Sequence, residues 1–325
     1  TARIHTVYMD CLTRLVRANF SEQLAAWCHD HGVRYIGHLI EDDGQHCRTG
    51  ASLGHYFRGL QGQDMAGIDD IGGQVLPQGE DEPRMDNMRR PRNGTFYHYG
   101  LATLAESAAA IEPSKGGNAM CEIFGNYGWA EGVRLEKYLA DHFLVRGINW
   151  FVPHAFSGKA FPDPDCPPHF YAHGHNPQYR HFGRLMAYMN RVATLTSAGA
   201  HEAPVAVLYH GEAEWCDPGA MPFEQVVRPL YDDQIACRVL PADVFSEPGR
   251  YQTELGNPLI VNGQPYRAFV VPGAARMPAA AANALAELSQ KGLPVFFAAS
   301  RPAALCEGGP LPAALAACPV VAPAD

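Results

Sequence analysis

The first 200 residues repeat one pattern, a short apolar run followed by an amphipathic segment, and this constrains the fold most. Each apolar run ends in or beside a polar side chain, and the runs span residues 33–41, 65–69, 118–125 and 148–154. The segments with helical periodicity span residues 23–31, 97–111, 134–145 and 179–193. Strands that carry polar residues at their C-terminal ends and continue into helices are typical of (β/α) barrels, whose sites lie at that face.

Four strands are too few to close an eight-stranded barrel, and half a barrel would leave two open edges. The chain also begins Thr1-Ala2-Arg3, without an initiator methionine. We therefore expect residues 1–200 to form the C-terminal part of a (β/α)8 TIM barrel, with further strands encoded upstream. The alternative is that additional strands within the chain escape the pattern.

A second region begins near residue 203, where the sequence becomes richer in Ala, Pro and Val. Its apolar runs span residues 205–209, 237–240, 268–273 and 294–298, with helical segments at 223–233 and 278–291. This alternation predicts a parallel α/β sheet over residues 203–325, joined to the barrel part by a hinge at 197–204. Neither Gly-x-Gly-x-x-Gly nor a phosphate loop occurs, so we expect a structural or oligomerisation role without a nucleotide site.

The amino-acid composition argues against two classes of binding partner, nucleic acid and membrane. The chain has 25 Lys and Arg against 34 Asp and Glu, a formal net charge of −9, which argues against nucleic acid as a partner. No apolar run is long enough to cross a bilayer, so no membrane is expected. The nine cysteines include no Cys-x-x-Cys pair, and several lie in apolar runs. We interpret them as mostly reduced thiols, which favours a cytoplasmic protein.

Two glutamates at strand ends are the candidate catalytic residues. Glu41 closes the first apolar run, and Glu122 lies in the third. A carboxylate beside a buried strand is costly unless it is paired or used. Glycosidic-bond cleavage requires two carboxyl groups, one to protonate the leaving oxygen and one to activate water or attack carbon. The alternative is that either glutamate pairs structurally with an arginine such as Arg146.

The residues around these glutamates are suited to a sugar. Tyr127 and Trp129 follow Glu122 in a glycine-rich stretch, where aromatic rings are expected to pack on sugar faces. Asp69 is expected to orient a sugar hydroxyl. His38 lies three residues before Glu41, so on a regular strand the two side chains point to opposite faces unless a bulge intervenes.

Metal binding is the other chemistry that the sequence leaves open. Asp69 and Asp70 could join Asp42 and Asp43 in holding Ca²⁺, although a solvated turn explains these residues equally well. No cofactor or metal is expected, and Ca²⁺ is the one alternative left open. The His-rich segment 166–175 contains His169, His173 and His175, which could suggest zinc. A lid whose imidazoles bond substrate hydroxyls is the preferred interpretation.

Longer motifs resemble a known group of enzymes. They are Glu122-Ile-Phe-Gly-Asn-Tyr-Gly-Trp129, Leu144-Val-Arg-Gly-Ile-Asn-Trp-Phe-Val-Pro-His154-Ala-Phe-Ser157, Gly37-His38-x-x-Glu41 and Gly67-Ile68-Asp69. Together they resemble large multidomain barrel glycoside hydrolases, α-L-rhamnosidase-like (family 106-like). The layout over about residues 5–300 is also similar to β-galactosidases whose middle domain mediates trimer formation.

The resemblance implies roles for named residues. Glu41 would be the general acid and Glu122 the base or nucleophile. The implied substrate-binding residues are His38, Asp69, Tyr127, Trp129, Asn149 and His154. Residues 203–325 would form a flavodoxin-like or amidotransferase-like α/β domain, with homo-oligomerisation through it.

The sequence therefore predicts a glycoside hydrolase acting on a carbohydrate substrate with a pair of strand-end carboxylates. A rival interpretation is a catalytically silent carbohydrate-binding or assembly fragment. A metal-dependent hydrolase that uses the His-rich segment is a third.

Overall fold

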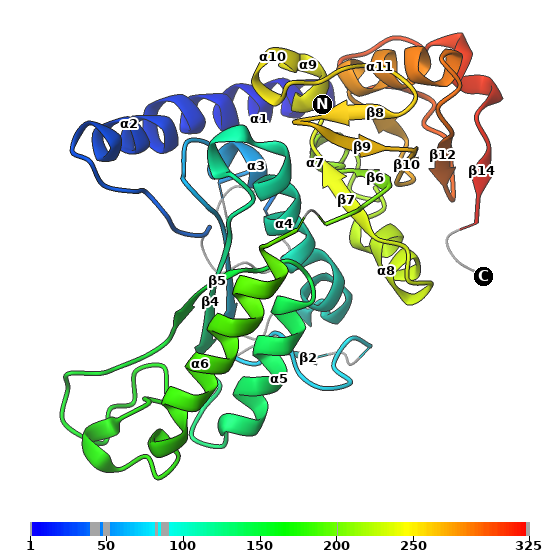
Figure 1. Ribbon diagram of the computed structural model, residues 1–325. Coiled ribbons are helices and arrows are strands. Elements are labelled where there is room, and N and C mark those ends of the chain that lie inside the picture. Colours follow the sequence, from blue (N-terminus) through cyan, green and yellow to red (C-terminus); the bar gives the residue numbers. More distant parts are fainter. Residues whose placement is uncertain are drawn as a thin grey trace.

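The computed structural model describes residues 2–39, 46–47, 53–81, 84–85, 91–199 and 201–322. Two parallel sheets, with helices packed around them, organise these residues (Figure 1). The first sheet has the order β1-β4-β5, and the second has the order β14-β12-β10-β6-β7. Three two-stranded ladders accompany them: β2 with β3 (Arg84–Met85 and Pro91–Arg92), β8 with β9 (Leu259–Val261 and Gln264–Tyr266), and β11 with β13 (Arg276–Met277 and Ala304–Leu305).

The first sheet follows the predicted order of strands and helices. Its strands are β1 (Ala66–Ile71), β4 (Ala119–Gly125) and β5 (Trp150–Pro153), and its helices are α4 (Leu101–Ile111), α5 (Val133–Leu144) and α6 (Tyr179–Thr196). Nearly every residue of α4 is buried, and this helix packs against β1 and β4 on one side and against β7 on the other. A helix that is apolar all round suits such a position between two layers.

The expected strand at 33–41 is not found over its described part. Residues 33–39 are extended but join no ladder. Two hydrogen bonds hold the segment at Tyr35: the backbone amide of Asp64 donates to the Tyr35 carbonyl oxygen, and the backbone amide of Tyr35 donates to the Asp64 carboxylate. At Gly67, an added Cβ would lie 1.7 Å from the carbonyl oxygen of Gly37. The segment therefore crosses β1 at a distance that only glycine allows, and Glu41 lies outside the described residues.

The second sheet is parallel at every pairing and uses β6 (Val205–Leu208), β7 (Cys237–Leu240), β10 (Ala268–Val271), β12 (Val295–Ala298) and β14 (Val320–Val321). Helices α8 (Glu224–Asp232) and α11 (Ala279–Gln290) match the predicted helical segments. The connection after β7 contains α9 (Asp243–Ser246), α10 (Pro248–Tyr251) and the hairpin of β8 and β9, which the sequence pattern did not predict.

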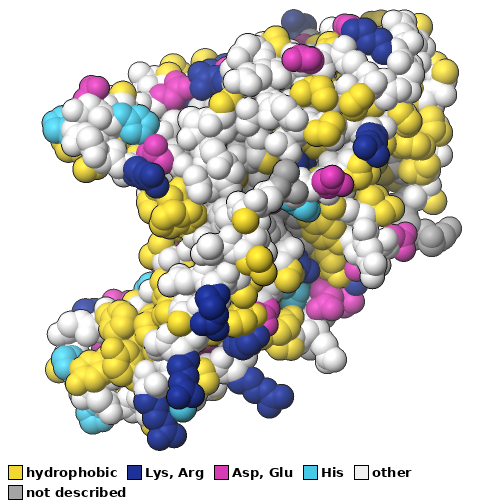
Figure 2. Space-filling view, viewed as in Figure 1, with side chains coloured by type: hydrophobic (Ala, Val, Ile, Leu, Met, Phe, Trp, Pro, Cys, Tyr) yellow, Lys and Arg dark blue, Asp and Glu magenta, His cyan; other side chains and the backbone are white. Residues whose placement is uncertain are grey.

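An N-terminal arm, also not predicted over its first part, completes the fold. It consists of α1 (Ala2–Val16) and α2 (Glu22–Asp30) and lies across the top of Figure 1. Figure 2 shows a recess between this arm and the lobe that carries α5 and α6. Helix α1 packs against α7 (Gly211–Cys216) of the second region. Among the described helices, none has both the length and the apolar composition to cross a membrane.

Buried ion pairs join the two sheet regions. Arg58, in the short helix α3 (Tyr56–Gly59), pairs with Asp243 at 2.7 Å, and both side chains are almost fully buried. Arg238 of β7 pairs with Glu106 of α4, also at 2.7 Å. Each arginine donates several hydrogen bonds to its carboxylate, which offsets the cost of burying the charges.

Candidate active site

Three predicted residues meet on one face of the first sheet, and two of them lie within β1 and β4 rather than at the predicted strand ends. His38, Asp69 of β1 and Glu122 of β4 each bring one nitrogen or oxygen atom to within 4.8 Å of the other two. Asp69 and Glu122 are register partners on neighbouring parallel strands, so their side chains share one face. Asp69 is buried, whereas His38 and Glu122 are each about one quarter exposed. Three ionisable side chains gathered on one sheet face can act together chemically.

His38 controls the charge of Glu122. The ring Nε2 of His38 lies 3.2 Å from Oε2 of Glu122, and its Nδ1 contacts the carbonyl oxygen of Leu39. The hydrogen bond and charge of His38 lower the pKa of Glu122, with a smaller contribution from His154. Glu122 is therefore ionised at neutral pH.

The backbone beyond Glu122 is held in an unusual conformation. Phe124 has φ 79° and Asn126 has φ 56°, both in the left-handed region that non-glycine residues seldom adopt. The pairing of β1 with β4 shifts register at Asp70 and Ile71, next to Asp69. Strained positions and bulges of this kind cluster at functional sites, where they aim side chains.

Tyr127 is held by hydrogen bonds within the protein. Its hydroxyl donates to the carboxylate of Asp70 at 2.8 Å and lies 2.9 Å from the carbonyl oxygen of Val75. The amide of Val75 donates to the same hydroxyl at 3.3 Å. This network ties the loop after β4 to the end of β1. Burial and the Asp70 charge raise the pKa of Tyr127, so its hydroxyl stays protonated.

Trp129 lies further along the same loop and is 43 % exposed. Its ring packs edge-on against Phe161, with centroids 5.6 Å apart, and against His169, at 5.9 Å. Both partners belong to the long segment between β5 and α6. A partly exposed indole supported from two sides is suited to stacking on an apolar ligand face.

The two predicted residues of the fourth run lie at opposite ends of β5. His154 follows the C-terminal end, where its amide bonds the carbonyl of Ile123 and its buried Nδ1 has no hydrogen-bond partner among the described residues. Asn149 precedes the strand, and its side chain bonds the amide of Ala119 and the carbonyl of Gly117. Five residues of extended chain span about 16 Å. Asn149 therefore lies at the end of β5 away from His154, where its amide joins the starts of β4 and β5, and substrate binding by Asn149 stays a prediction.

The cluster can be tested as a metal site. Imidazole with two carboxylates suits a transition-metal ion better than Ca²⁺, which takes about six to eight oxygen ligands. The sequence suggested Asp70 as a Ca²⁺ ligand, but in the structure its carboxylate accepts a hydrogen bond from the Tyr127 hydroxyl. Asp42 and Asp43 lie outside the described residues, as does Glu41. The described donors alone do not fit Ca²⁺.

The His-rich segment does not converge on a zinc site over its described residues. His169 bonds the carbonyl oxygen of Asp165 at 2.9 Å, and His173 bonds that of Lys159 at 2.7 Å. His175 stacks on Phe161 with centroids 4.1 Å apart. These imidazoles hold the loop that supports Trp129. The zinc interpretation is set aside for this reason.

A buried acidic cluster behind the site was not predicted. Glu131 is 6 % exposed, and neither of its carboxyl oxygens has a hydrogen-bond partner among the described residues. Burial, with nearby Glu136 and Asp70, raises the pKa of Glu131 to about 9. Burial alone raises the pKa of Glu136 to about 7. A glutamate in a loop gives no sequence signal of burial, so only the structure reveals this cluster.

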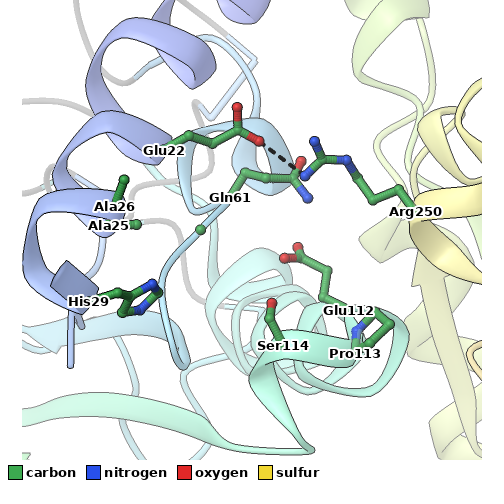
Figure 3. Close-up of a pocket in the computed structure, with 10 residues that line it drawn as sticks. Glu22, Ala25, Ala26, His29, Gln61, Glu112, Pro113, Ser114 and Arg250 are labelled. Atoms are coloured by element: carbon green, nitrogen blue, oxygen red, sulfur yellow. Dashed lines mark ion pairs between the residues drawn. The ribbon is translucent and has the colours of Figure 1, made fainter. Parts of the chain in front are cut away.

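A separate cavity of about 440 Å³ lies near the start of β4, away from Glu122. Figure 3 shows Glu22 and Arg250 on one side of it and Glu112 on the other. Glu22 pairs with Arg250 at 3.0 Å, and Glu112 pairs with Lys115 at 3.1 Å. Both acids are neutralised by cations, so we do not assign the catalytic chemistry to this cavity.

Solved structures with a similar fold are glycosidases. A rhamnosidase from Novosphingobium sp. PP1Y aligns with a TM-score of 0.61 and 18 % identity, over 92 % of this chain and 26 % of that one. Gan42B, a GH42 β-galactosidase, aligns with a TM-score of 0.62 and 12 % identity, over 96 % of this chain and 44 % of that one. The cold-adapted β-galactosidase from Rahnella sp. R3 aligns with a TM-score of 0.54 and 13 % identity, over 79 % of this chain and 36 % of that one.

These alignments define a glycoside-hydrolase-like α/β fold, of the partial-barrel type. The chain spans about a quarter of the rhamnosidase and less than half of either β-galactosidase. A scan against protein-family models finds none that matches, and a search of curated proteins finds no match. At these identities the likeness concerns the fold, and the chemistry must be argued from the site.

Proposed function

We propose that this chain forms part of the active site of a glycoside hydrolase and that Glu122 is its ionised carboxylate. The observation that carries the proposal is the hydrogen bond from His38 to Glu122, beside Asp69 on one face of the first sheet. An ionised, partly exposed carboxylate in such a cluster is suited to attack a sugar carbon or to activate water. It is unsuited to donate a proton to a leaving group.

The acid partner has two candidates. Glu41 is the candidate from the sequence, supported by the resemblance of its motif to rhamnosidase-like enzymes. Asp69 is the candidate from geometry, because it lies beside Glu122. Retaining enzymes hold their carboxyl groups about 5–5.5 Å apart and inverting enzymes about 6.5–9.5 Å. Asp69 would suit the narrow spacing, whereas the rhamnosidase-like resemblance favours Glu41 with the wider, inverting one.

Residues 203–325 are proposed to form a flavodoxin-like domain with a structural role. Taken in chain order, the strands of its sheet run 2-1-3-4-5, the order of flavodoxin-like sheets. In such sheets ligands bind where the order reverses, here between β6 and β10. At the end of β6, Tyr209 packs on His55 and Phe57, and Glu212 lies 3.7 Å from Arg58. The first region thus occupies that position, which supports a structural role.

Hydrolysis of aryl glycosides by the full-length protein tests the proposal. We expect turnover of an aryl α-L-rhamnoside or an aryl β-D-galactoside, the sugars that the similar enzymes are named for. Turnover of neither, together with tight binding of the free sugars, would support the silent carbohydrate-binding alternative. Sedimentation velocity on the same sample tests self-association through the second domain.

A further inference from the structure

Two cysteines outside the candidate site lie in direct contact. The sulfur atoms of Cys216, at the end of α7, and Cys306, directly after β13, are 3.3 Å apart. Both thiols also approach the carbonyl oxygen of Glu212, at 3.6 and 3.7 Å. Other described cysteines contact oxygen instead: Cys47 bonds the Tyr209 hydroxyl and Cys318 that of Ser289.

The pair combines a reachable sulfur with a sheltered one. Cys216 is partly exposed, whereas Cys306 is 1 % exposed. A disulfide bond is about 2.05 Å long, so closing it requires the sulfurs to approach by only about 1 Å more. The hydrogen bond from Cys306 lowers the pKa of Cys216 to about 7, and the nearby Arg276 adds to this. A substantial fraction of Cys216 is then thiolate, the reactive form.

We propose that Cys216 and Cys306 are an oxidation site that forms a reversible intramolecular disulfide. A hydroperoxide or a small-molecule disulfide supplies the oxidising equivalents. With a hydroperoxide, the Cys216 thiolate attacks the peroxide oxygen and becomes a sulfenic acid, releasing water or an alcohol. Cys306 then attacks the Cys216 sulfur, forming the S–S bond and releasing water. The two thiols together lose two electrons and two protons, and a thiol reductant reverses the step.

The crosslink would fix, within the second region, the helix that contacts the first region. Helix α7 packs on α1, and its Glu212 lies 3.7 Å from both His55 and Arg58 of the first region. A bond from Cys216 to Cys306 ties this helix to the end of β13. It also closes a chain loop of 90 residues, which restricts the unfolded ensemble. Oxidation should therefore raise the melting temperature of the full-length protein.

Mass spectrometry of non-reduced digests tests the proposal directly. The full-length protein is treated with hydrogen peroxide or oxidised glutathione, and peptides that join Cys216 to Cys306 are quantified before and after thiol reduction. We expect near-complete linkage, reversed by the reductant, and an upward shift of the melting midpoint by roughly 5 °C or more. Cys11→Ser, which removes an exposed cysteine outside the pair, should leave both results unchanged.

Two variants separate a specific pair from general oxidation. Cys216→Ser removes the partly exposed thiol with little change in volume, and Cys306→Ala removes the buried one. Neither variant should show the rise in melting temperature. The proposal is overturned if parental Cys216 ends as a sulfinic acid or a glutathione adduct while Cys306 stays free. It is equally overturned if Cys216 remains reduced once Cys11 is fully oxidised.

Discussion

Asp69 and Glu122 occupy paired positions on neighbouring parallel strands, and their carboxylates approach the same imidazole, that of His38. Two adjacent carboxylates ordinarily raise each other's pKa, because their charges repel. Here the pKa of Glu122 is lowered, with the hydrogen bond from His38 as the largest cause. The His38 imidazole therefore keeps Glu122 ionised to lower pH than an ordinary glutamate.

Removing His38 should move the acidic limb of the pH–rate profile. In the parent, His38 lowers the pKa of Glu122, so the ionised form persists to lower pH. In His38→Ala that pKa rises, and activity should be lost at a higher pH on acidification. His31→Ala is the matched control, because it removes an exposed histidine that contacts Trp27 at the end of α2. An acidic limb unchanged in His38→Ala would contradict the role given to this histidine.

Tyr127→Phe distinguishes loop positioning from sugar binding. The variant removes the hydroxyl bonds to Asp70 and Val75, so we expect a loss of about 1–3 kcal/mol in unfolding free energy. The turnover number should fall, because the loop after β4 loses its anchor, while KM changes little. The opposite result, unchanged stability with a raised KM, would show that the hydroxyl binds substrate directly.

Glu131→Gln should stabilise the protein at neutral and alkaline pH. The folded-state pKa of Glu131 is raised to about 9 from an ordinary 4.5, with Glu136 and Asp70 nearby. Below the unfolded-state pKa the carboxyl group is protonated in both states and costs no folding free energy. As the pH rises from there toward 9, the group ionises in the unfolded chain only, so the free energy of unfolding declines. Glutamine removes this loss, which at about 1.4 kcal/mol per pH unit above 4.5 amounts to several kcal/mol at pH 8.

Denaturant unfolding of Glu131→Gln at pH 5 and pH 8 checks that expectation. Glu287→Gln, at an exposed position of α11 that pairs with Lys291, is the control and should change stability little at either pH. A Glu131→Gln protein no more stable than the parent at pH 8 would show that this carboxyl group is ionised and solvated in the folded state.

Arg58→Met tests the junction between the two regions. It leaves Asp243 buried without its main partner, at a cost of about 3–5 kcal/mol. Arg228→Met breaks the exposed pair with Asp81 and should cost less than about 1 kcal/mol. Burial alone would raise the pKa of Asp243, but Arg58 lowers it overall. The ion pair therefore stabilises the folded protein at pH values above the ordinary aspartate pKa, and this stabilisation is lost as the pH falls.

The same pair makes a second, pH-dependent expectation. The parent should lose stability as pH falls below about 4, and Arg58→Met should lose less of it there, because the ion pair is already absent. Urea midpoints of parent and variant between pH 2 and pH 7 check this. Parallel curves over that range would rule out the pair as a source of the acid sensitivity.

Local periodicity predicted most elements, because buried strands and amphipathic helices carry their own pattern. Strands β1, β4, β5 and β6 appear where the apolar runs placed them. The segment 33–39 joins no ladder, and it lies so close to β1 that an added Cβ at Gly67 would meet the carbonyl oxygen of Gly37. The motif that suggested Asn149 did not reveal at which end of β5 this residue lies.

Long-range pairings were beyond the sequence. The contact of His38 with Glu122 joins residues 84 positions apart, and the expected alternation on a strand gave no guide to it. The buried Glu131 and the Cys216–Cys306 contact depend on how loops fold over the sheets, which local pattern does not encode. The strand-end rule singled out Asp69 and Glu122, which the structure brings together within β1 and β4 rather than at the ends of these strands, and their catalytic roles stay a prediction.

The kcat/KM of Glu122→Gln in the full-length protein tests the central claim most directly. Glutamine keeps the shape of the side chain but cannot act as a base or nucleophile. On the best aryl glycoside we expect a loss of about 1,000-fold or more, with an unchanged melting temperature and Glu287→Gln at parental activity. A Glu122→Gln enzyme within about tenfold of the parent would contradict the assignment, since general acid–base catalysis alone contributes about 100-fold or more.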